Sequence, residues 1–214
     1  MMFQDRQEAG QLLAEKIAEL DFKNAVVYAL PRGGVVLGLE VAKKISAPLD
    51  LVIARKIGHP QNPEYAICAI TEDGQMTCNE EEKKSVDPRR LEESAKKEME
   101  EAKRRRNLYL KGRPHILATG KKAIIVDDGI ATGLTIIAAV KYLKKENPSK
   151  IIVAVPVAPK DAVLEMKRYA DQVVALESPE KYLGAVGAYY RDFPQVSDQE
   201  VIAILMTNIV YISH

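Results

Sequence analysis

Apolar residues form two patterns that alternate along the chain. Short continuous apolar runs, typical of buried strands, cover residues 25–30, 49–54, 123–126, 151–157 and 172–176. Between several of these runs, apolar residues recur at helical spacing, at 35–45, from Gly133 to about 143, and at 161–169. The alternation predicts an α/β fold with a doubly wound, mainly parallel sheet and right-handed crossovers.

Capping patterns predict one further helix near each end of the chain. Asp5 with Glu8 resembles a capping box and precedes a stripe of leucine and isoleucine residues, which predicts a first helix that covers the sheet. Ser197 with Glu200 predicts the start of a final helix in the same way.

The middle of the chain follows other rules. Runs at 66–71 and 75–78 flank Glu72-Asp73-Gly74 and predict a hairpin. Residues 58–65 contain two prolines and predict an irregular loop. Residues 88–111 are dense in Glu, Lys and Arg. Their 103–106 cluster of one Lys and three Arg is typical of a solvated helix face, with phosphate attraction or a subunit contact as the alternative.

A candidate ligand site lies where the run ending at Val126 meets Asp127 and Asp128, a loop of small residues, and then a helix. Ligands of open α/β sheets bind at such carboxyl ends of strands, and the first N–H groups of a helix suit a phosphate. Hydroxyls of Thr132 and Thr135 can add hydrogen bonds. The two carboxylates would instead accept hydrogen bonds from sugar hydroxyls or hold a hard cation.

Cationic residues follow two other predicted strands. Pro31-Arg32-Gly33-Gly34 ends the run at 25–30; its glycines permit unusual backbone angles, and Arg32 suits a phosphate or pyrophosphate. The alternative is an ordinary strand-to-helix turn with a surface Arg. Arg55-Lys56 ends the run at 49–54, where it either contacts the ligand or is solvated.

Aromatic and histidine residues leave alternatives open. Tyr182, Tyr189 and Tyr190 lie in a Gly-containing segment at 178–193 and would either stack on a planar substrate or pack in the core. His59 is either an acid or base or a surface residue.

Composition narrows the function classes. The chain has 31 Lys and Arg against 30 Asp and Glu. It therefore lacks the basic excess that would favour nucleic acid or a membrane surface as a partner. The absence of a signal region or a long apolar segment predicts a cytoplasmic protein. Cys68 and Cys78 could meet across the hairpin, but we expect unpaired thiols.

Residues 126–135, Val-Asp-Asp-Gly-Ile-Ala-Thr-Gly-Leu-Thr, resemble the signature of the type I phosphoribosyltransferases, which bind 5-phosphoribosyl 1-pyrophosphate (PRPP). The resemblance extends to residues 31–34, which look like the family's pyrophosphate loop, and it implies a non-proline cis peptide between Pro31 and Arg32. It also implies a fold of one domain, 1–214, with an insertion at about 72–118 and a C-terminal hood at about 178–196.

The resemblance implies a role for each candidate residue. Asp127 and Asp128 would bind the ribose hydroxyls, directly or through Mg²⁺ and water, and the segment after Lys56 would be a mobile catalytic loop. The hood, with its three tyrosines, would recognise a base. The implied assignments are catalytic Asp127, Asp128, Arg32 and Lys56; 5-phosphate-binding Ala131, Thr132, Gly133, Leu134 and Thr135; and pyrophosphate-binding Arg32, Gly33, Gly34 and Arg55.

The function implied is Mg²⁺-dependent transfer of the phosphoribosyl group from PRPP to a nucleobase or related nitrogen nucleophile, with release of pyrophosphate. The alternatives are a non-catalytic sensor of PRPP or a nucleotide and a generic phosphate-binding protein. Enzymes for 6-oxopurines carry an Asp where this chain has Ala131, which disfavours such acceptors. The expected partners are therefore PRPP and another nucleobase-like molecule, without nucleic acid or membrane, and the resemblance leaves room for a homodimer.

Overall fold

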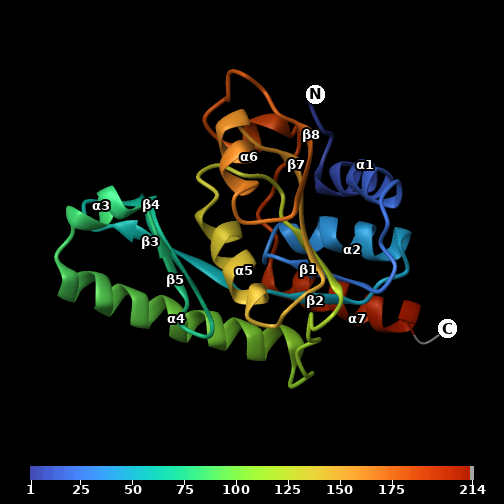
Figure 1. The fold of residues 1–214 in the computed structure, drawn as a ribbon, viewed down its shortest axis with the longest axis horizontal. Helices are drawn as coiled ribbons and strands as arrows, with labels where there is room; N and C mark the ends of the chain where they lie inside the picture. Colours follow the sequence, from blue (N-terminus) through green and yellow to red (C-terminus); the bar gives the residue numbers. More distant parts are fainter. Residues whose placement is uncertain (213–214) are drawn as a thin grey trace.

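A five-stranded parallel sheet forms the centre of the protein, as seen in a computed structural model that describes residues 1–212 (Figure 1). The strand order is β2-β1-β6-β7-β8. The strands are β1 (Ala25–Ala29), β2 (Leu49–Leu51), β6 (Lys122–Val126), β7 (Lys150–Val157) and β8 (Gln172–Glu177). β1 lies between β2 and β6, so the chain leaves it in one direction for β2 and later crosses to its other side. This arrangement confirms the predicted α/β fold and creates a switch point between β1 and β6.

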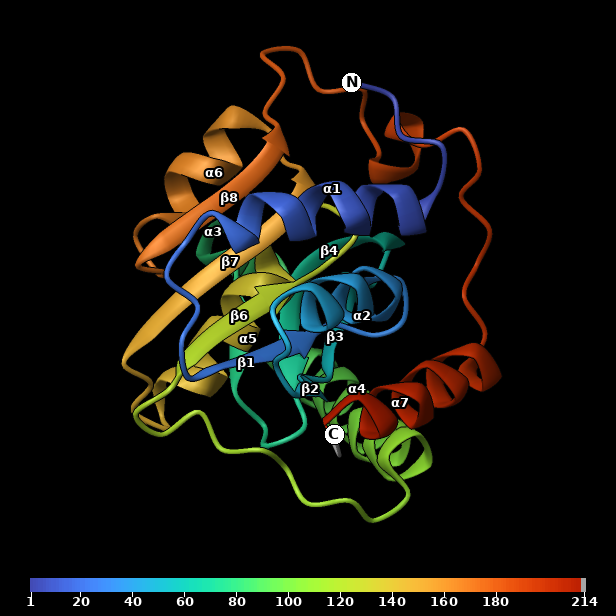
Figure 2. The same ribbon diagram turned by 90° about the vertical axis from the view of Figure 1, so that its right-hand side faces the viewer.

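Helices cover both faces of the sheet, which explains why its strands are continuous apolar runs rather than alternating ones. Figure 2 shows α1 (Arg6–Ala18) and α2 (Gly34–Lys44) on the near face, with α7 (Asp198–Ile212) beside α2 at the β2 edge. On the other face lie α5 (Leu134–Lys144) and α6 (Lys160–Met166). Each face buries its own apolar cluster, and Val27 and Tyr28 of β1 point to opposite ones. Within residues 1–212, no helix combines the length and apolarity needed to cross a bilayer.

The predicted caps at the two ends are present. The Asp5 carboxylate accepts a hydrogen bond from the Glu8 backbone N–H at 2.8 Å, and α1 starts at the next residue after Asp5. At the other end, the Ser197 hydroxyl accepts from the Glu200 backbone N–H at 3.2 Å, while the Glu200 carboxylate accepts from the Ser197 backbone N–H at 2.7 Å. Each pair satisfies N–H groups that a helix start leaves unpaired.

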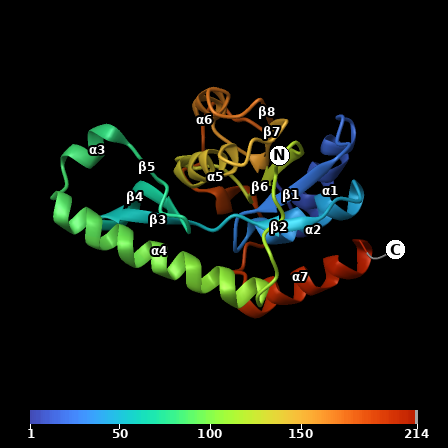
Figure 3. The ribbon, with the colours of Figure 1, turned by 60° about the horizontal axis from the view of Figure 1, so that its bottom comes forward.

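Residues 54–110 form an arm that extends to one side of the sheet (Figures 1 and 3). It contains an antiparallel sheet of order β3-β4-β5 and two helices. One face of the small sheet packs on the long helix of the arm, and β3 and β4 also contact α5 of the core. The elements of the arm are β3 (Ala54–His59), β4 (Asn62–Thr71), β5 (Met76–Cys78), α3 (Glu80–Lys84) and α4 (Pro88–Leu110).

Two expectations about the strands of the arm are wrong. Residues 58–65 form no irregular loop: β3 runs to His59 and β4 starts at Asn62, with register shifts on both sides of Gly58. Cys68 and Cys78 are not free thiols but a disulfide. They are register partners across β4 and β5, with Cα atoms 3.9 Å apart. The predicted hairpin turn at 72–74 is confirmed, with Gly74 at φ +85°.

A buried set of charged groups, which we call the junction network, joins the arm to the core. His115 lies between two carboxylates, with Nδ1 2.7 Å from Asp50 Oδ2 and Nε2 2.7 Å from Glu146 Oε1. Arg106 of α4 pairs with Glu72 at 2.8 Å, and Asp50 Oδ2 lies 3.8 Å from the same guanidinium. Arg106 therefore does not belong to a solvated face, which corrects the expectation for its cluster, whereas Arg104 and Arg105 pair with Glu101 on their own helix.

Candidate active site

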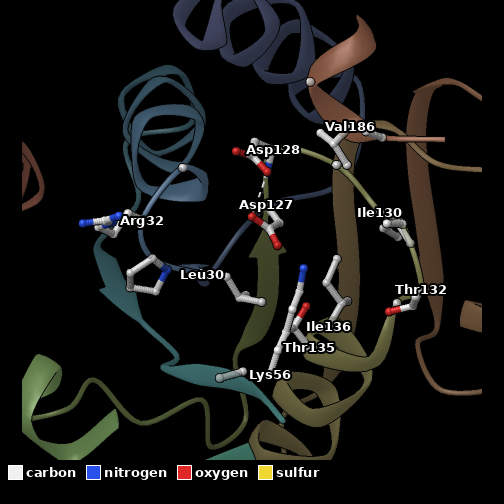
Figure 4. A pocket seen from close by; sticks show the side chains of 18 of the residues that line it. Leu30, Arg32, Lys56, Asp127, Asp128, Ile130, Thr132, Thr135, Ile136 and Val186 are labelled. Atoms are coloured by element: carbon white, nitrogen blue, oxygen red, sulfur yellow. Dashed lines mark hydrogen bonds between the residues drawn. The ribbon is translucent and has the colours of Figure 1, made fainter. Parts of the chain in front are cut away.

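A cavity of about 640 Å³ opens at the carboxyl ends of β1 and β6, at the switch point of the sheet (Figure 4). Four segments line it: residues 30–33 after β1, 54–56 at the start of the arm, 127–136 after β6 except Leu134, and hood residues 184–187 with Phe193. The structure thus brings together three predicted site segments that lie up to about a hundred residues apart in the chain.

The acidic pair Asp127-Asp128 lies at the centre of the cavity (Figure 4). Asp127 accepts a hydrogen bond from the Asp128 backbone N–H at 2.8 Å. Burial, followed by repulsion from Asp128, raises the pKa of Asp127 well above its usual range. Burial also raises the pKa of Asp128, against the lowering effect of the Arg6 guanidinium. Two adjacent, half-buried carboxylates favour a cation or hydrogen-bond donors as their partners.

The predicted phosphate loop follows the acidic pair and ends at the start of α5. Ile130 donates its backbone N–H to the Val157 carbonyl at 2.8 Å, which ties the loop to β7. Gly133 adopts φ +77°, a conformation that glycine enters at little cost. Thr132 and Thr135 line the cavity, but Leu134 is buried and points into the core. Unpaired N–H groups at this helix start can bind an anion.

The loop after β1 packs tightly against the acidic pair. The peptide bond between Pro31 and Arg32 is cis, as the family resemblance implied. A Cβ atom on Gly33 would lie 2.0 Å from Asp128 Oδ2, and one on Gly34 would lie 2.7 Å from the Val126 carbonyl oxygen. Only glycine fits at these two positions. Gly33 lines the cavity, whereas Gly34 lies behind it at the start of α2.

Three predicted cations line the cavity, and two of them have acidic partners outside it. Arg55 pairs with Glu98 of α4 at 2.7 Å. Arg32 lies 3.6 Å from Asp198 at the start of α7. Figure 4 shows the Lys56 side chain extending towards Asp127. The positive charge of Lys56 opposes, but does not cancel, the rise in the pKa of Asp127.

The hood approaches the cavity through residues other than the predicted tyrosines. Val186 packs against Gly129, where an added Cβ would lie 2.6 Å from Val186 Cγ1. Tyr189 and Tyr190 are buried, and Tyr182 stacks on Tyr189 with ring centroids 5.5 Å apart. None of the three lines the cavity, because their rings pack within the hood and against the N-terminal segment. His59 lies at the end of β3, next to the turn into β4, and is likewise absent from the cavity lining.

Arg6 is the site residue that the sequence did not indicate. Its Nε donates to Asp128 Oδ2 at 2.8 Å, and its guanidinium carbon lies 3.6 Å from the centroid of the Phe193 ring. An Arg in the first turn of an amphipathic helix has no local signal that separates it from a surface residue. Only the packing of α1 across the sheet brings it to Asp128, behind the cavity wall.

Comparison with known proteins agrees with this geometry. Residues 4–191 match the phosphoribosyl transferase domain family. Two curated Mycobacterium tuberculosis proteins, from strains CDC 1551 and H37Rv and provisionally named phosphoribosyl transferases, are each 43% identical over 206 residues. These matches cover 95% of this chain and 46% of each relative, so the chain spans about half their length. The crystal structure of TT1426 from Thermus thermophilus has 42% identity and a TM-score of 0.81, covering 97% of this chain and 99% of that one. The chain belongs to the phosphoribosyl transferase domain family.

Proposed function

We propose that the protein transfers the phosphoribosyl group of PRPP to a nitrogen nucleophile of nucleobase type and releases pyrophosphate. The observation that carries this proposal is the convergence of an acidic pair, the start of α5 and three cations on one cavity. PRPP has a matching order of groups: a 5-phosphate, two ribose hydroxyls and a pyrophosphate. The curated relatives and the family support the same class of reaction.

Each part of the cavity would hold one part of the donor. The backbone N–H groups of 131–135 and the hydroxyls of Thr132 and Thr135 would bind the 5-phosphate. Asp127 and Asp128 would accept hydrogen bonds from the ribose hydroxyls. Arg32, Arg55 and Lys56 would face the pyrophosphate and offset its charge.

The acidic pair fits a magnesium ion. Mg²⁺ in phosphate-transfer sites is held by one or two carboxylates together with substrate oxygens and water. Among the described residues, no three or more His, Cys, Asp or Glu form a cluster suited to a metal. Asp127 and Asp128 would therefore hold the ion jointly with PRPP. When bound, Mg²⁺ would add positive charge at the leaving pyrophosphate.

The chain's own groups would act mainly by position and charge. In the transfer, the bond between the anomeric carbon and the pyrophosphate oxygen breaks and a bond to the acceptor nitrogen forms. Cations at Arg32, Arg55 and Lys56 would stabilise the negative charge that gathers on the departing pyrophosphate. The hood would cover the acceptor side of the anomeric carbon and limit access of water, which would otherwise hydrolyse the donor.

Ala131, Val186 and Phe193 restrict the class of acceptor. Ala131 provides no carboxylate to face a base, which disfavours 6-oxopurines, and the hood offers Val186 and Phe193 as apolar surfaces at the cavity. An uncharged ring of nucleobase size would suit such surfaces.

Pyrophosphate release tests the proposal. The protein is incubated with PRPP, Mg²⁺ and a panel of nitrogen bases, and release is compared with the double variant Asp127→Asn, Asp128→Asn. Release with one base, lost in the variant, is the expected result. Binding of PRPP by calorimetry without release in the presence of any base would favour a sensor of PRPP. Equal PRPP binding by the wild type and the double variant would contradict the ribose assignment.

A further inference from the structure

We propose that Arg6 is a positioning residue that holds Asp128 and the hood in one fixed arrangement, so that the sugar-binding and base-binding halves of the cavity stay aligned. The inference rests on the proposed function, because it concerns the site for PRPP and its acceptor. Arg6 lies outside both halves and is absent from the cavity lining.

The planar guanidinium of Arg6 makes three contacts that a lysine ammonium could not make at the same time. Its Nε donates to Asp128 Oδ2 at 2.8 Å and its Nη1 donates to the Pro194 carbonyl at 2.6 Å. The face of the same group lies over the Phe193 ring, 3.6 Å from its centroid. The Arg6 side chain is only 11% exposed and its bond to Asp128 is partly buried, which strengthens that charge-assisted hydrogen bond, whereas the bond to the Pro194 carbonyl lies at the surface.

The segment before Arg6 is fastened to the hood by its backbone. Phe3 donates its N–H to the Tyr189 carbonyl at 2.8 Å and accepts from the Arg191 N–H at 2.9 Å. The Gln4 carbonyl accepts from the Asp192 N–H, also at 2.9 Å. These three bonds bring the start of α1 to a defined place beside the hood, so the direction of the Arg6 side chain follows from the hood's own position.

The Arg6–Asp128 pair is also the point at which the pyrophosphate loop meets the hood. A Cβ on Gly33 would lie 2.8 Å from Arg6 Nε, so the loop passes directly against the pair. From the other side, the Tyr190 hydroxyl donates to the Asp128 carbonyl oxygen at 2.6 Å. A displacement of Arg6 would therefore change the positions of Asp128, of the pyrophosphate loop at Gly33 and of Phe193.

Lysine is the informative replacement. Arg6→Lys keeps a cation for Asp128 but lacks the planar fork that reaches the Pro194 carbonyl while lying over Phe193. Binding of the sugar-phosphate half should then survive, whereas binding that depends on the hood should weaken. A merely structural ion pair would instead weaken both halves in parallel.

Calorimetry with Mg²⁺ separates the two halves. The probes are PRPP, ribose 5-phosphate, and the nucleotides AMP, IMP and UMP, of which the tightest for the wild type is used. The measured quantity is the ratio of nucleotide affinity to ribose 5-phosphate affinity. We expect Arg6→Lys to lower this ratio about tenfold and to change PRPP affinity by about threefold or less.

Two further variants guard the interpretation. Arg6→Gln removes the charge but keeps a hydrogen-bond donor, and it should lower both the affinity for PRPP and the affinity ratio. If circular dichroism shows that Arg6→Lys does not fold, the affinity ratio of Arg6→Gln tests the positioning role instead. Glu15→Gln removes an exposed pair between α1 and Lys44 and should leave both quantities unchanged.

The outcomes distinguish this inference from the proposed function. A ratio unchanged in both Arg6 variants would overturn the positioning role, and so would nucleotides that bind the wild type no better than ribose 5-phosphate; PRPP binding would leave the proposed function intact in either case. A wild type that binds no PRPP would overturn both.

Discussion

The cavity and the junction network both gather buried charges, but they are built in opposite ways. Most charges of the cavity come from short loops that directly follow strands, and its two carboxylates repel each other with raised pKa values. The junction network draws on residues that lie far apart in the chain and matches nearly every charge with a partner at 2.7–3.8 Å. The first arrangement would leave charge available to a ligand, whereas the second uses charge to fix the arm.

The comparison predicts that the network carries more stability than the cavity. Replacing Arg106 by Leu should cost about 3–5 kcal/mol in the free energy of unfolding, because Glu72 would remain buried without its cation and Asp50 would keep only His115. Urea unfolding measures this loss. Arg104→Leu on the same helix is the control, since its exposed pair with Glu101 should be worth about 1 kcal/mol or less. Equal losses in the two variants would contradict the distinction.

The cavity should show the reverse behaviour. Asp127→Asn should lower the rate of pyrophosphate release about 10²- to 10³-fold, the range for loss of one charged group that acts on the transition state. Its free energy of unfolding should stay equal or rise by about 1 kcal/mol, because the burial of two adjacent carboxylates is costly. Thermal unfolding and pyrophosphate release are measured on the same samples.

Asp161→Asn serves as the control for that experiment. Asp161 lies in the first turn of α6 at the surface and accepts a hydrogen bond from the Ala162 backbone N–H. Its replacement should change neither turnover nor stability by more than a small factor. A marked loss of stability in Asp127→Asn would contradict a site that stores charge at the expense of stability.

Proton binding at His115 should give the smallest effect. The neighbouring Asp50 and Glu146 raise the pKa of His115 against the opposing effect of burial. Tyr28, Tyr142, Arg106 and Glu72 complete its charged and titratable surroundings. A raised pKa in the folded state means that protonated His115 contributes its full stability below its ordinary pKa of 6.5. That contribution is lost as the pH rises through the folded-state value.

Urea unfolding at several pH values checks this direction. Between about pH 6 and about pH 9, the wild type should lose up to about 1 kcal/mol more than His115→Gln, which cannot titrate. A parallel pH dependence of the two proteins would show that His115 does not titrate in this range. Asp50 acts in the opposite direction: its pKa is lowered, so its contribution is lost only as the pH falls through that lowered value.

Much of the fold and of the candidate site could be predicted because the information is local. Continuous apolar runs identify the buried strands 25–29, 122–126 and 150–157 wherever they lie in the sheet. The motif at 126–135 contains its strand end, acids and helix start within ten residues. Residues 31–33 reach the same cavity because carboxyl ends of parallel strands share one edge.

The sequence left more open where a residue's role depends on a distant partner. Tyr182, Tyr189 and Tyr190 could have stacked on a base or packed in the core, and the structure packs their rings within the hood and on Phe3. The disulfide depended on the register of β4 and β5, which places Cys68 opposite Cys78.

The sequence by itself determined the class of fold, the strand-end loops and the family motif at 126–135, because hydrophobic periodicity and short motifs act within a few residues of the chain. Tertiary structure decided which side chains surround those loops. Arg6 reaches Asp128 across 122 positions, and Arg106 reaches Glu72 only because α4 returns along the core. Such pairs stem from the packing of whole elements, and a single residue in an amphipathic helix carries no mark of the partner that packing will bring to it.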